Sequence, residues 1–209
     1  MPNPDLEPTI RHPAPEIGPR AQRSIDRILE ATREVFLARG YGGASIDRIA
    51  DAAGVSRASF YTYFPTKRDA LLALGVGKTR RARAVIRQLR QLGPSWTVDD
   101  LRAWTATMFE FLDEYGTFGT AWGQAAHEDD ELREAGLKTH LETCRKLGEA
   151  MDELRGGPTG DTTLQGLIVW NMYDGVWNQC RLYQPEVTTS DAAPEIVNFL
   201  AAVLKAGLT

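Results

Sequence analysis

Apolar side chains recur at intervals of three and four residues along most of this chain, and Gly, Pro and capping residues separate the segments that carry them. Such spacing predicts amphipathic α-helices. The chain is therefore predicted to be all-α. The predicted helices cover about 21–39, 46–53, 57–62, 67–92, 98–115, 117–127, 129–155 and 162–183, and a last helix begins at Pro194.

The segment 45–72 contains two short predicted helices, a tight turn and the start of a third helix. Ser45 is a predicted N-cap, since its hydroxyl can accept from a free N–H of the first turn. Gly54 stands where the chain must turn sharply, and glycine adopts the left-handed conformation without a Cβ penalty. Ser56 can cap the next helix, whose Phe60 points inward. The arrangement is typical of a helix-turn-helix.

The outward side of the second motif helix carries hydrogen-bond donors with almost no aliphatic bulk. Guanidinium, hydroxyl and phenol groups suit phosphate oxygens and base edges in the major groove. The alternative is a small helical subdomain with a solvated polar face. The outward residues are Arg57, Ser59, Tyr61, Thr62 and Tyr63.

The third motif helix has its own start signal. Pro65 ends the preceding helix, and Thr66 and Asp69 have the spacing of a capping box. The free N–H groups of this helix start, with Lys67 beside them, would suit a phosphate.

These residues carry a resemblance to a known family. The DNA-binding signature of TetR-family transcriptional regulators resembles the pattern Ile46-x-x-Ile49-Ala50-x-x-Ala53-Gly54-Val55-Ser56-x-x-x-Phe60-Tyr61-x-Tyr63-Phe64-x-x-Lys67-x-x-Leu71. By this resemblance, bases and phosphates would be contacted by Arg57, Ala58, Ser59 and Tyr61. Phosphates would be contacted mainly by Ser45, Arg48, Tyr63 and Lys67. With Thr62, these residues are the predicted DNA-binding set.

The charge distribution supports a DNA-binding end. The net charge of −4 alone argues against a nucleic-acid partner. However, the segment 20–92 has fifteen Lys/Arg and six Asp/Glu, a net charge of +9, whereas 93–209 has eight and nineteen, a net charge of −11. A basic end of this kind supplies non-specific attraction to phosphates.

We predict three regions along the chain. Residues 1–19 contain six prolines and no apolar period, and are predicted to form a disordered arm. Residues 20–68 form the predicted helix-turn-helix head, and residues 69–209 form a larger helical body for effector binding and dimerisation. The helix from Lys67 links head and body.

The predicted helix 162–183 is apolar on nearly all sides, as a helix buried on more than one side would be. Asn171, Asp174 and Asn178 lie close to one face of it, and buried polar groups need partners. They either complete hydrogen bonds inside the core or line a cavity beside Trp170, Tyr173 and Trp177. Both alternatives stay open at this point. The apolar band of the last helix is wider than one neighbour requires, and a second chain would cover it.

The family resemblance implies an all-α homodimer whose last two helices form an intersubunit four-helix bundle, and a body ligand that shifts the two heads. A weaker resemblance rests on Phe60-Tyr61-x-Tyr63-Phe64-Pro65, Gly123-Gln124-Ala125-Ala126 and Asn171-Met172. It is to the TetR subgroup that includes the mycobacterial repressor of ethionamide activation, and it implies an elongated, mainly aromatic pocket. The candidate effector contacts are Trp104, Met108, Phe111, Trp122, Trp170, Asn171, Tyr173, Asp174 and Trp177. Asp174 stands where that subgroup suggests a neutral amide.

The sequence therefore predicts a regulator, expected to be a repressor, that binds a near-palindromic double-stranded operator as a homodimer and is released by an apolar or aromatic small molecule. The alternatives are a helix-turn-helix protein without an effector, or an all-α enzyme. No nucleophile elbow, Cys–His pairing or phosphate-binding Gly loop favours an enzyme, and no catalytic residue is assigned.

No cofactor and no metal site are expected, because His127, Glu128, Asp130 and His140 fit no ligand spacing. Cys144 and Cys180 are not predicted to form a disulfide. No apolar run is long enough to span a membrane and no signal-peptide core is present, so a cytoplasmic protein is expected.

Overall fold

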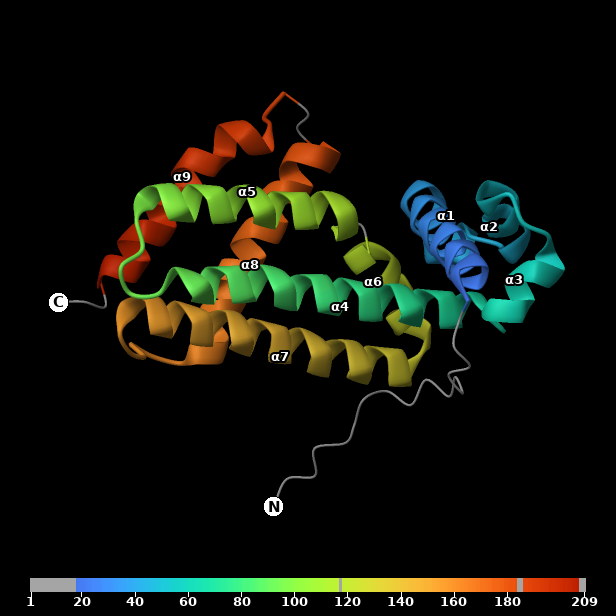
Figure 1. The fold of residues 1–209 in the computed structure, drawn as a ribbon, viewed down its shortest axis with the longest axis horizontal. Coiled ribbons are helices and arrows are strands. Elements are labelled where there is room, and N and C mark those ends of the chain that lie inside the picture. Colours follow the sequence, from blue (N-terminus) through green and yellow to red (C-terminus); the bar gives the residue numbers. More distant parts are fainter. Residues whose placement is uncertain (1–17, 117, 184–185, 207–209) are drawn as a thin grey trace, which may run out of the picture. The chain divides into compact units, whose positions relative to one another are not determined.

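The computed structural model describes residues 18–116, 118–183 and 186–206. These residues form α-helices and one π-helical turn, without a strand among them, which confirms the predicted all-α class (Figure 1). The helices are α1 (Pro19–Gly43), α2 (Ile46–Ala53), α3 (Arg57–Tyr63), α4 (Lys67–Leu92), α5 (Val98–Tyr115), α6 (Phe118–Glu128), α7 (Asp130–Arg155), α8 (Thr162–Asn178), followed by the π turn (Gln179–Tyr183), and α9 (Thr189–Lys205).

Two compact units divide the chain. The first unit runs up to Leu74 and also contains Ala121–Ala135, whereas the second unit contains Gly75–Thr120 and Gly136–Thr209. The sequence predicts a single boundary at 68/69, with every later residue in the body. The structure therefore differs in giving the end of α6 and the start of α7 to the unit that carries the helix-turn-helix.

Long-range polar contacts inside the first unit explain this assignment. The backbone N–H of Tyr41 donates to Gln124 Oε1 at 2.6 Å. Arg68 Nε donates to Asp129 Oδ2 at 2.6 Å, and Asp129 also caps α7 by accepting from the N–H of Leu132 at 3.0 Å. Acidic residues at the start of α7 complement the helix dipole. Asp129 also has a specific cationic partner, Arg68.

Helix α1 starts and ends differently from the prediction. Pro19 occupies its first turn, where a missing N–H costs nothing. The predicted end at Gly40 is a kink with φ 66° and ψ 173°, after which the helix continues to Gly43. Residues 1–17 of the predicted arm lie outside the described residues.

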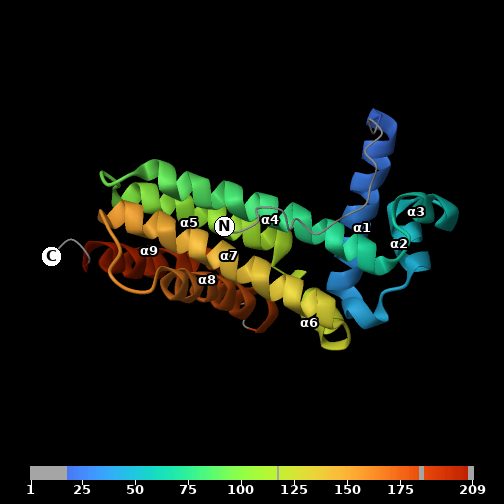
Figure 2. The ribbon, with the colours of Figure 1, turned by 90° about the horizontal axis from the view of Figure 1, so that it is seen from below.

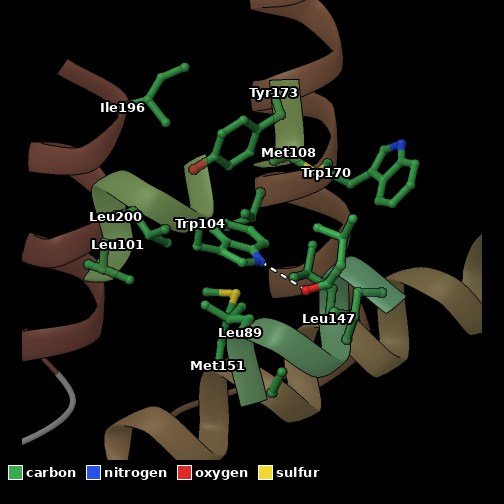
Figure 3. Close-up of a cluster of buried hydrophobic side chains, with 14 of the residues drawn as sticks. Leu89, Leu101, Trp104, Met108, Leu147, Met151, Trp170, Tyr173, Ile196 and Leu200 are labelled. Atoms are coloured by element: carbon green, nitrogen blue, oxygen red, sulfur yellow. Dashed lines mark hydrogen bonds between the residues drawn. The ribbon is translucent and has the colours of Figure 1, made fainter. Parts of the chain in front are cut away.

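The second unit is organised around a single hydrophobic core. Side chains from α4, α5, α7, α8 and α9 meet in it, and α5 packs directly against α9 and α8. Figure 3 shows Trp104 of α5 at its centre, with Leu89 and Leu147 on one side and Tyr173 on the other. Helices α4 and α7 run side by side in this unit (Figures 1 and 2), joined at the surface by the ion pair of Arg90 with Glu153 at 2.9 Å.

The start of α9 corrects one prediction. Pro194 lies inside the helix and does not begin it, because Thr188 and Asp191 form a capping box that starts α9 at Thr189. Thr97 and Asp100 form the same device at the start of α5. No helix among the described residues is long and apolar enough to cross a membrane.

Candidate DNA-binding surface and effector site

The helix-turn-helix is built from the local signals that the sequence contains. Ser45 Oγ accepts from the N–H of Arg48 at 3.3 Å and caps α2, and Ser56 Oγ accepts from the N–H of Ser59 at 3.1 Å and caps α3. Gly54 ends α2 in the left-handed conformation, with φ 60° and ψ 41°. All three predicted features of the turn are present.

Burial orients α3. Phe60 is 0% exposed and Phe64 is 4% exposed, and α2 contributes the buried side chains of Ile49, Ala50 and Ala53 beneath them. With its apolar side held in this way, α3 turns its other side outward. Arg57, Ala58, Tyr61 and Thr62 are exposed, and Ser59 and Tyr63 are half-buried.

Arg57 is held in place before any DNA is bound. Its Nη1 donates to both carboxylate oxygens of Asp47, at 2.7 and 2.8 Å, and its Nη2 donates to the Tyr61 hydroxyl at 3.1 Å. The Tyr61 hydrogen bond and the Asp47 carboxylate raise the pKa of the guanidinium. A planar guanidinium fixed in this way is suited to bidentate contact with a guanine edge or a phosphate.

The candidate phosphate contacts have different surroundings. Arg48 is exposed and its Nη1 donates to the carbonyl of Gly43 at 3.2 Å. Lys67 Nζ donates to the carbonyls of Tyr41 and Ala44, at 2.8 and 3.2 Å, and lies 4.3 Å from the centre of the Tyr41 ring. The Lys67 ammonium therefore ties the end of α1 to the start of α4.

The capping box predicted at the start of α4 is present. The N–H of Thr66 donates to Asp69 Oδ2 at 2.9 Å, and the N–H of Asp69 donates to Thr66 Oγ1 at 3.2 Å. These bonds engage N–H groups at the start of α4, where the sequence predicts free donors suited to a phosphate.

Sequence reasoning missed Arg27 of α1. Its Nη2 donates to the carbonyls of Ala53 and Gly54, the latter at 3.2 Å, and so holds the end of α2. A Cβ placed on Gly54 would lie 2.6 Å from this nitrogen. No local pattern could have indicated this contact, because Arg27 lies in another helix.

Several predicted effector contacts are parts of the packed core of the second unit. Trp104 donates through Nε1 to the carbonyl of Val85 at 3.0 Å, as the dashed line in Figure 3 shows. The hydroxyls of Thr105 and Tyr173 lie 2.8 Å apart, and both residues are 0% exposed. The buried core also contains Met108 and Phe111. The polar atoms of these aromatic residues are thus satisfied within the protein.

The polar residues of α8 correct the expectation that all three are buried. Asn171 is exposed, and its Nδ2 donates to the carbonyl of Leu167 in the same helix. Asp174 is half-buried and accepts from Asn178 Nδ2 at 2.9 Å. The buried Trp177 donates through Nε1 to Asp113 at 2.8 Å.

The structure does not bring all the effector candidates together. Trp170 is buried and its ring stands edge-to-face against Phe111, with ring centres 5.7 Å apart. Trp122 belongs to the first unit, whereas the other candidates belong to the second. Among the described residues, no group of three or more His, Cys, Asp or Glu side chains is placed to hold a metal ion.

Exposed apolar side chains mark one surface of α8 and α9. Leu164, Ile168 and Phe199 are each more than half exposed. Ile168 and Phe199 also line a groove of about 390 Å³, whose other apolar walls include Met151 and Val203. Apolar side chains left exposed on adjacent helices are typical of an interface.

Comparisons with known proteins agree with this architecture. The family model described as "Bacterial regulatory proteins, tetR family" matches residues 28–74. The transcriptional activator FasR of Mycolicibacterium smegmatis is 35% identical over 97 residues, which are 46% of this chain and 42% of FasR. The transcriptional regulator CymR of Pseudomonas putida is 34% identical over 136 residues, which are 63% of this chain and 64% of CymR.

Structural similarity extends over more of the chain. The fatty acid degradation regulator FadR of Bacillus halodurans superposes with a TM-score of 0.66 at 20% identity, covering 87% of this chain and 96% of FadR. A TetR-like transcriptional regulator from Rhodococcus sp. RHA1 also superposes with a TM-score of 0.66, at 18% identity, covering 89% of this chain and 97% of that protein.

The matches to the curated relatives span less than two thirds of their lengths. The family model covers the helix-turn-helix, whose geometry is described above, and the similar solved structures share the fold beyond it. On these findings, residues 28–74 match the tetR family of bacterial regulatory proteins, and the fold of the chain is similar to that of TetR-like regulators.

Proposed function

We propose that this chain is a ligand-responsive transcriptional regulator that binds a near-palindromic DNA operator as a homodimer. The observation that carries the proposal is the outward side of α3. Arg57 and Tyr61 stand exposed on it, while Phe60 fixes the helix from beneath. Such a helix can enter the major groove and read base edges, and neighbouring positive charge strengthens its binding to phosphates.

A dimer gives this short helix useful specificity. One motif helix contacts few base pairs, whereas two helices about 34–36 Å apart read two half-sites one turn apart. The exposed apolar side chains of α8 and α9, Leu164, Ile168 and Phe199, support association through the last two helices. A two-fold dimer of this kind requires a near-palindromic operator.

The proposal also includes release of the operator when an effector binds. An apolar small molecule that binds the second unit would favour a head spacing unsuited to the operator, which requires unequal affinity for the two states. We expect release to derepress the target gene. Because the relative FasR is named an activator, a reporter assay with the operator placed upstream of a promoter decides the direction.

DNA binding is tested by fluorescence anisotropy with genomic fragments at physiological salt. A specific site is expected, and its absence would contradict the proposal. Tyr61→Phe should weaken specific binding if the phenol contacts DNA. Arg102→Ala is the matched control, because Arg102 is an exposed α5 residue of the second unit with a local ion pair to Asp99.

The dimer is tested by sedimentation. Phe199→Glu places a charge on the apolar surface of α9, and should convert a dimer into monomers. Val187→Glu is the control, since Val187 is exposed but precedes α9. A wild-type monomer at micromolar concentration, or a Phe199→Glu dimer as stable as wild type, would contradict association through this surface.

A second candidate function is DNA binding without an effector. The observation that favours it is the packed core around Trp104, Phe111 and Tyr173, whose polar atoms are bonded internally. Thermal-shift screening separates the two candidates, because a tight ligand stabilises the folded state by mass action. Stabilisation by members of an apolar library supports the effector, and no stabilisation favours the second candidate.

A further inference from the structure

Lys78 is a cation inside the second unit, on the part of α4 that belongs to it. The side chain is half-buried, and Nζ lies 5.1 Å from the centre of the Phe118 ring and 5.8 Å from the centre of the Trp170 ring. Aromatic faces attract an ammonium through their quadrupole. Figure 3 shows that the Trp170 ring lies apart from the Trp104–Tyr173 pair, on another side of the core.

No residue in the described part of the chain forms an ion pair or a hydrogen bond with the Lys78 ammonium. No carboxylate oxygen described there lies within 4.0 Å of Nζ, and Nζ donates no hydrogen bond to a described residue. Burial lowers the pKa of Lys78, and the nearby Asp174 and Cys144 act in the opposite direction. Aromatic rings replace only part of the lost hydration of an ammonium, so an unbonded one is costly.

The groups that face Lys78 come from α7 and α8. His140 stands edge-to-face against Trp170, with ring centres 5.9 Å apart, and its Nε2 lies 3.7 Å from Cys144 Sγ. Burial and then the Lys78 charge lower the pKa of His140, whereas Asp174 acts in the opposite direction. Both effects favour the neutral form of His140, which can offer one N–H.

Asp174 completes the cluster. Its carboxylate already accepts from Asn178 Nδ2, and burial raises its pKa, with Lys78 and His140 opposing. The cluster thus combines an ammonium that has no hydrogen-bond acceptor among the described residues with a carboxylate that has a donor. A cationic ligand at Asp174 would be repelled by Lys78, whereas an anionic group would gain the ammonium and would favour the protonated form of Asp174.

We propose that Lys78 binds the acidic group of the effector, and that the effector is an amphipathic carboxylic acid whose apolar part packs beside Trp170 and Phe118. This inference rests on the proposed function, because it assigns the chemistry of the effector of that regulator. The inference places the effector site at the cluster of Lys78, His140, Trp170 and Asp174, and no longer at the core aromatic residues around Trp104.

The test compares carboxylic acids with their primary amides, which have nearly the same shape and no charge. The probes are naphthalene-2-carboxylic acid with naphthalene-2-carboxamide, and decanoic acid with decanamide. Calorimetric titration of the full chain should show at least one acid binding about tenfold or more tighter than its amide, the ratio expected for a charge-assisted hydrogen bond.

Variants identify the residue responsible. Lys78→Met keeps most of the aliphatic stem and should remove the preference for the acid, leaving the affinity for the amide within about twofold. Lys78→Arg keeps the charge and should keep the preference for the acid. This result would show that the effect of Lys78→Met comes from the lost charge and not from misfolding. Arg80→Met is the control, because Arg80 is an exposed cation of the same helix.

Three results would overturn the inference: equal binding of acid and amide, binding of neither, or an unchanged acid preference in folded Lys78→Met. DNA binding, measured on the same samples, separates this inference from the proposed function. A specific operator complex without acid binding overturns the acid site alone. Lys78-dependent acid binding without any operator overturns the regulator but supports the acid site. Dissociation of the operator complex by the acid supports both.

Discussion

The guanidinium of Arg57 donates to both carboxylate oxygens of Asp47, at 2.7 and 2.8 Å, across the turn between α2 and α3. This ion pair joins the two helices of the motif at the surface proposed to meet DNA. Both side chains are more than half exposed, so the pair adds little stability. Its consequence is orientation, because Arg57 is positioned before the operator arrives.

Replacing Arg57 should therefore affect DNA binding more than folding. We expect Arg57→Ala to weaken specific operator binding about 10–100-fold, the range for loss of a bidentate base contact. Asp47→Asn should raise affinity for non-specific DNA, since it removes a negative charge beside the phosphates. Anisotropy titrations at several salt concentrations measure both effects. Unchanged operator affinity in Arg57→Ala would remove this residue from the DNA-binding set.

The kink of α1 provides a stability prediction. Gly40 has φ 66° and ψ 173°, a conformation nearly restricted to glycine, and a Cβ there would lie 2.5 Å from Gln124 Oε1. Gly40→Ala should lower the free energy of unfolding by about 1–3 kcal/mol. Gly42→Ala is the control, because a Cβ at Gly42 meets nothing within 4 Å. Urea denaturation measures both, and equal effects of the two substitutions would contradict the prediction.

Two glycines of α8 differ in the space around them, because one lies where α8 packs closely against α7. A Cβ at Gly166 would lie 1.9 Å from the carbonyl oxygen of Cys144, whereas one at Gly175 in the same helix would meet nothing within 4 Å. Gly166→Ala should destabilise the second unit strongly, by about 3 kcal/mol or more, because the helices must separate. Gly175→Ala should stabilise by up to about 1 kcal/mol, since alanine favours helix. Thermal denaturation of both variants is the measurement, and a Gly166→Ala protein as stable as wild type would exclude the close crossing.

A surface cluster on α7 should make stability depend on pH. Hydrogen bonds from Arg145, and then from Lys146, lower the pKa of Glu142 from 4.5 to about 2. A lowered carboxylate pKa stabilises the folded state above pH 4.5, and this contribution is lost as the pH falls towards about 2. Glu142 is 39% exposed, so the effect should stay below about 1 kcal/mol.

The measurement compares wild type with Glu142→Gln in urea between pH 7 and pH 2.5. Their difference in unfolding free energy should be constant above pH 5 and shrink at lower pH. Glu110→Gln is the control, because Glu110 is exposed and forms no ion pair with any residue that the structure describes. A difference that grows on acidification would contradict the assignment.

The local parts of this protein follow from its sequence. The caps at Ser45 and Ser56, the left-handed Gly54 and the capping box of Thr66 and Asp69 all stand as predicted. Each depends on groups within a few residues of one another, so the spacing of residue types is sufficient to predict it. The all-α class follows for the same reason, because the apolar period of each helix is a local property.

The contacts between distant segments were decided only by tertiary packing. Arg27 holds the turn at Ala53, and Gln124 and Asp129 join the first unit, although no sequence pattern connects them to their partners. Packing also placed Trp104 in the core and left Lys78 without a hydrogen-bond acceptor among the described residues. Aromatic residues recur at the same helical spacing whether they pack in a core or contact a ligand. Only the residues that surround them in the folded protein distinguish the two cases.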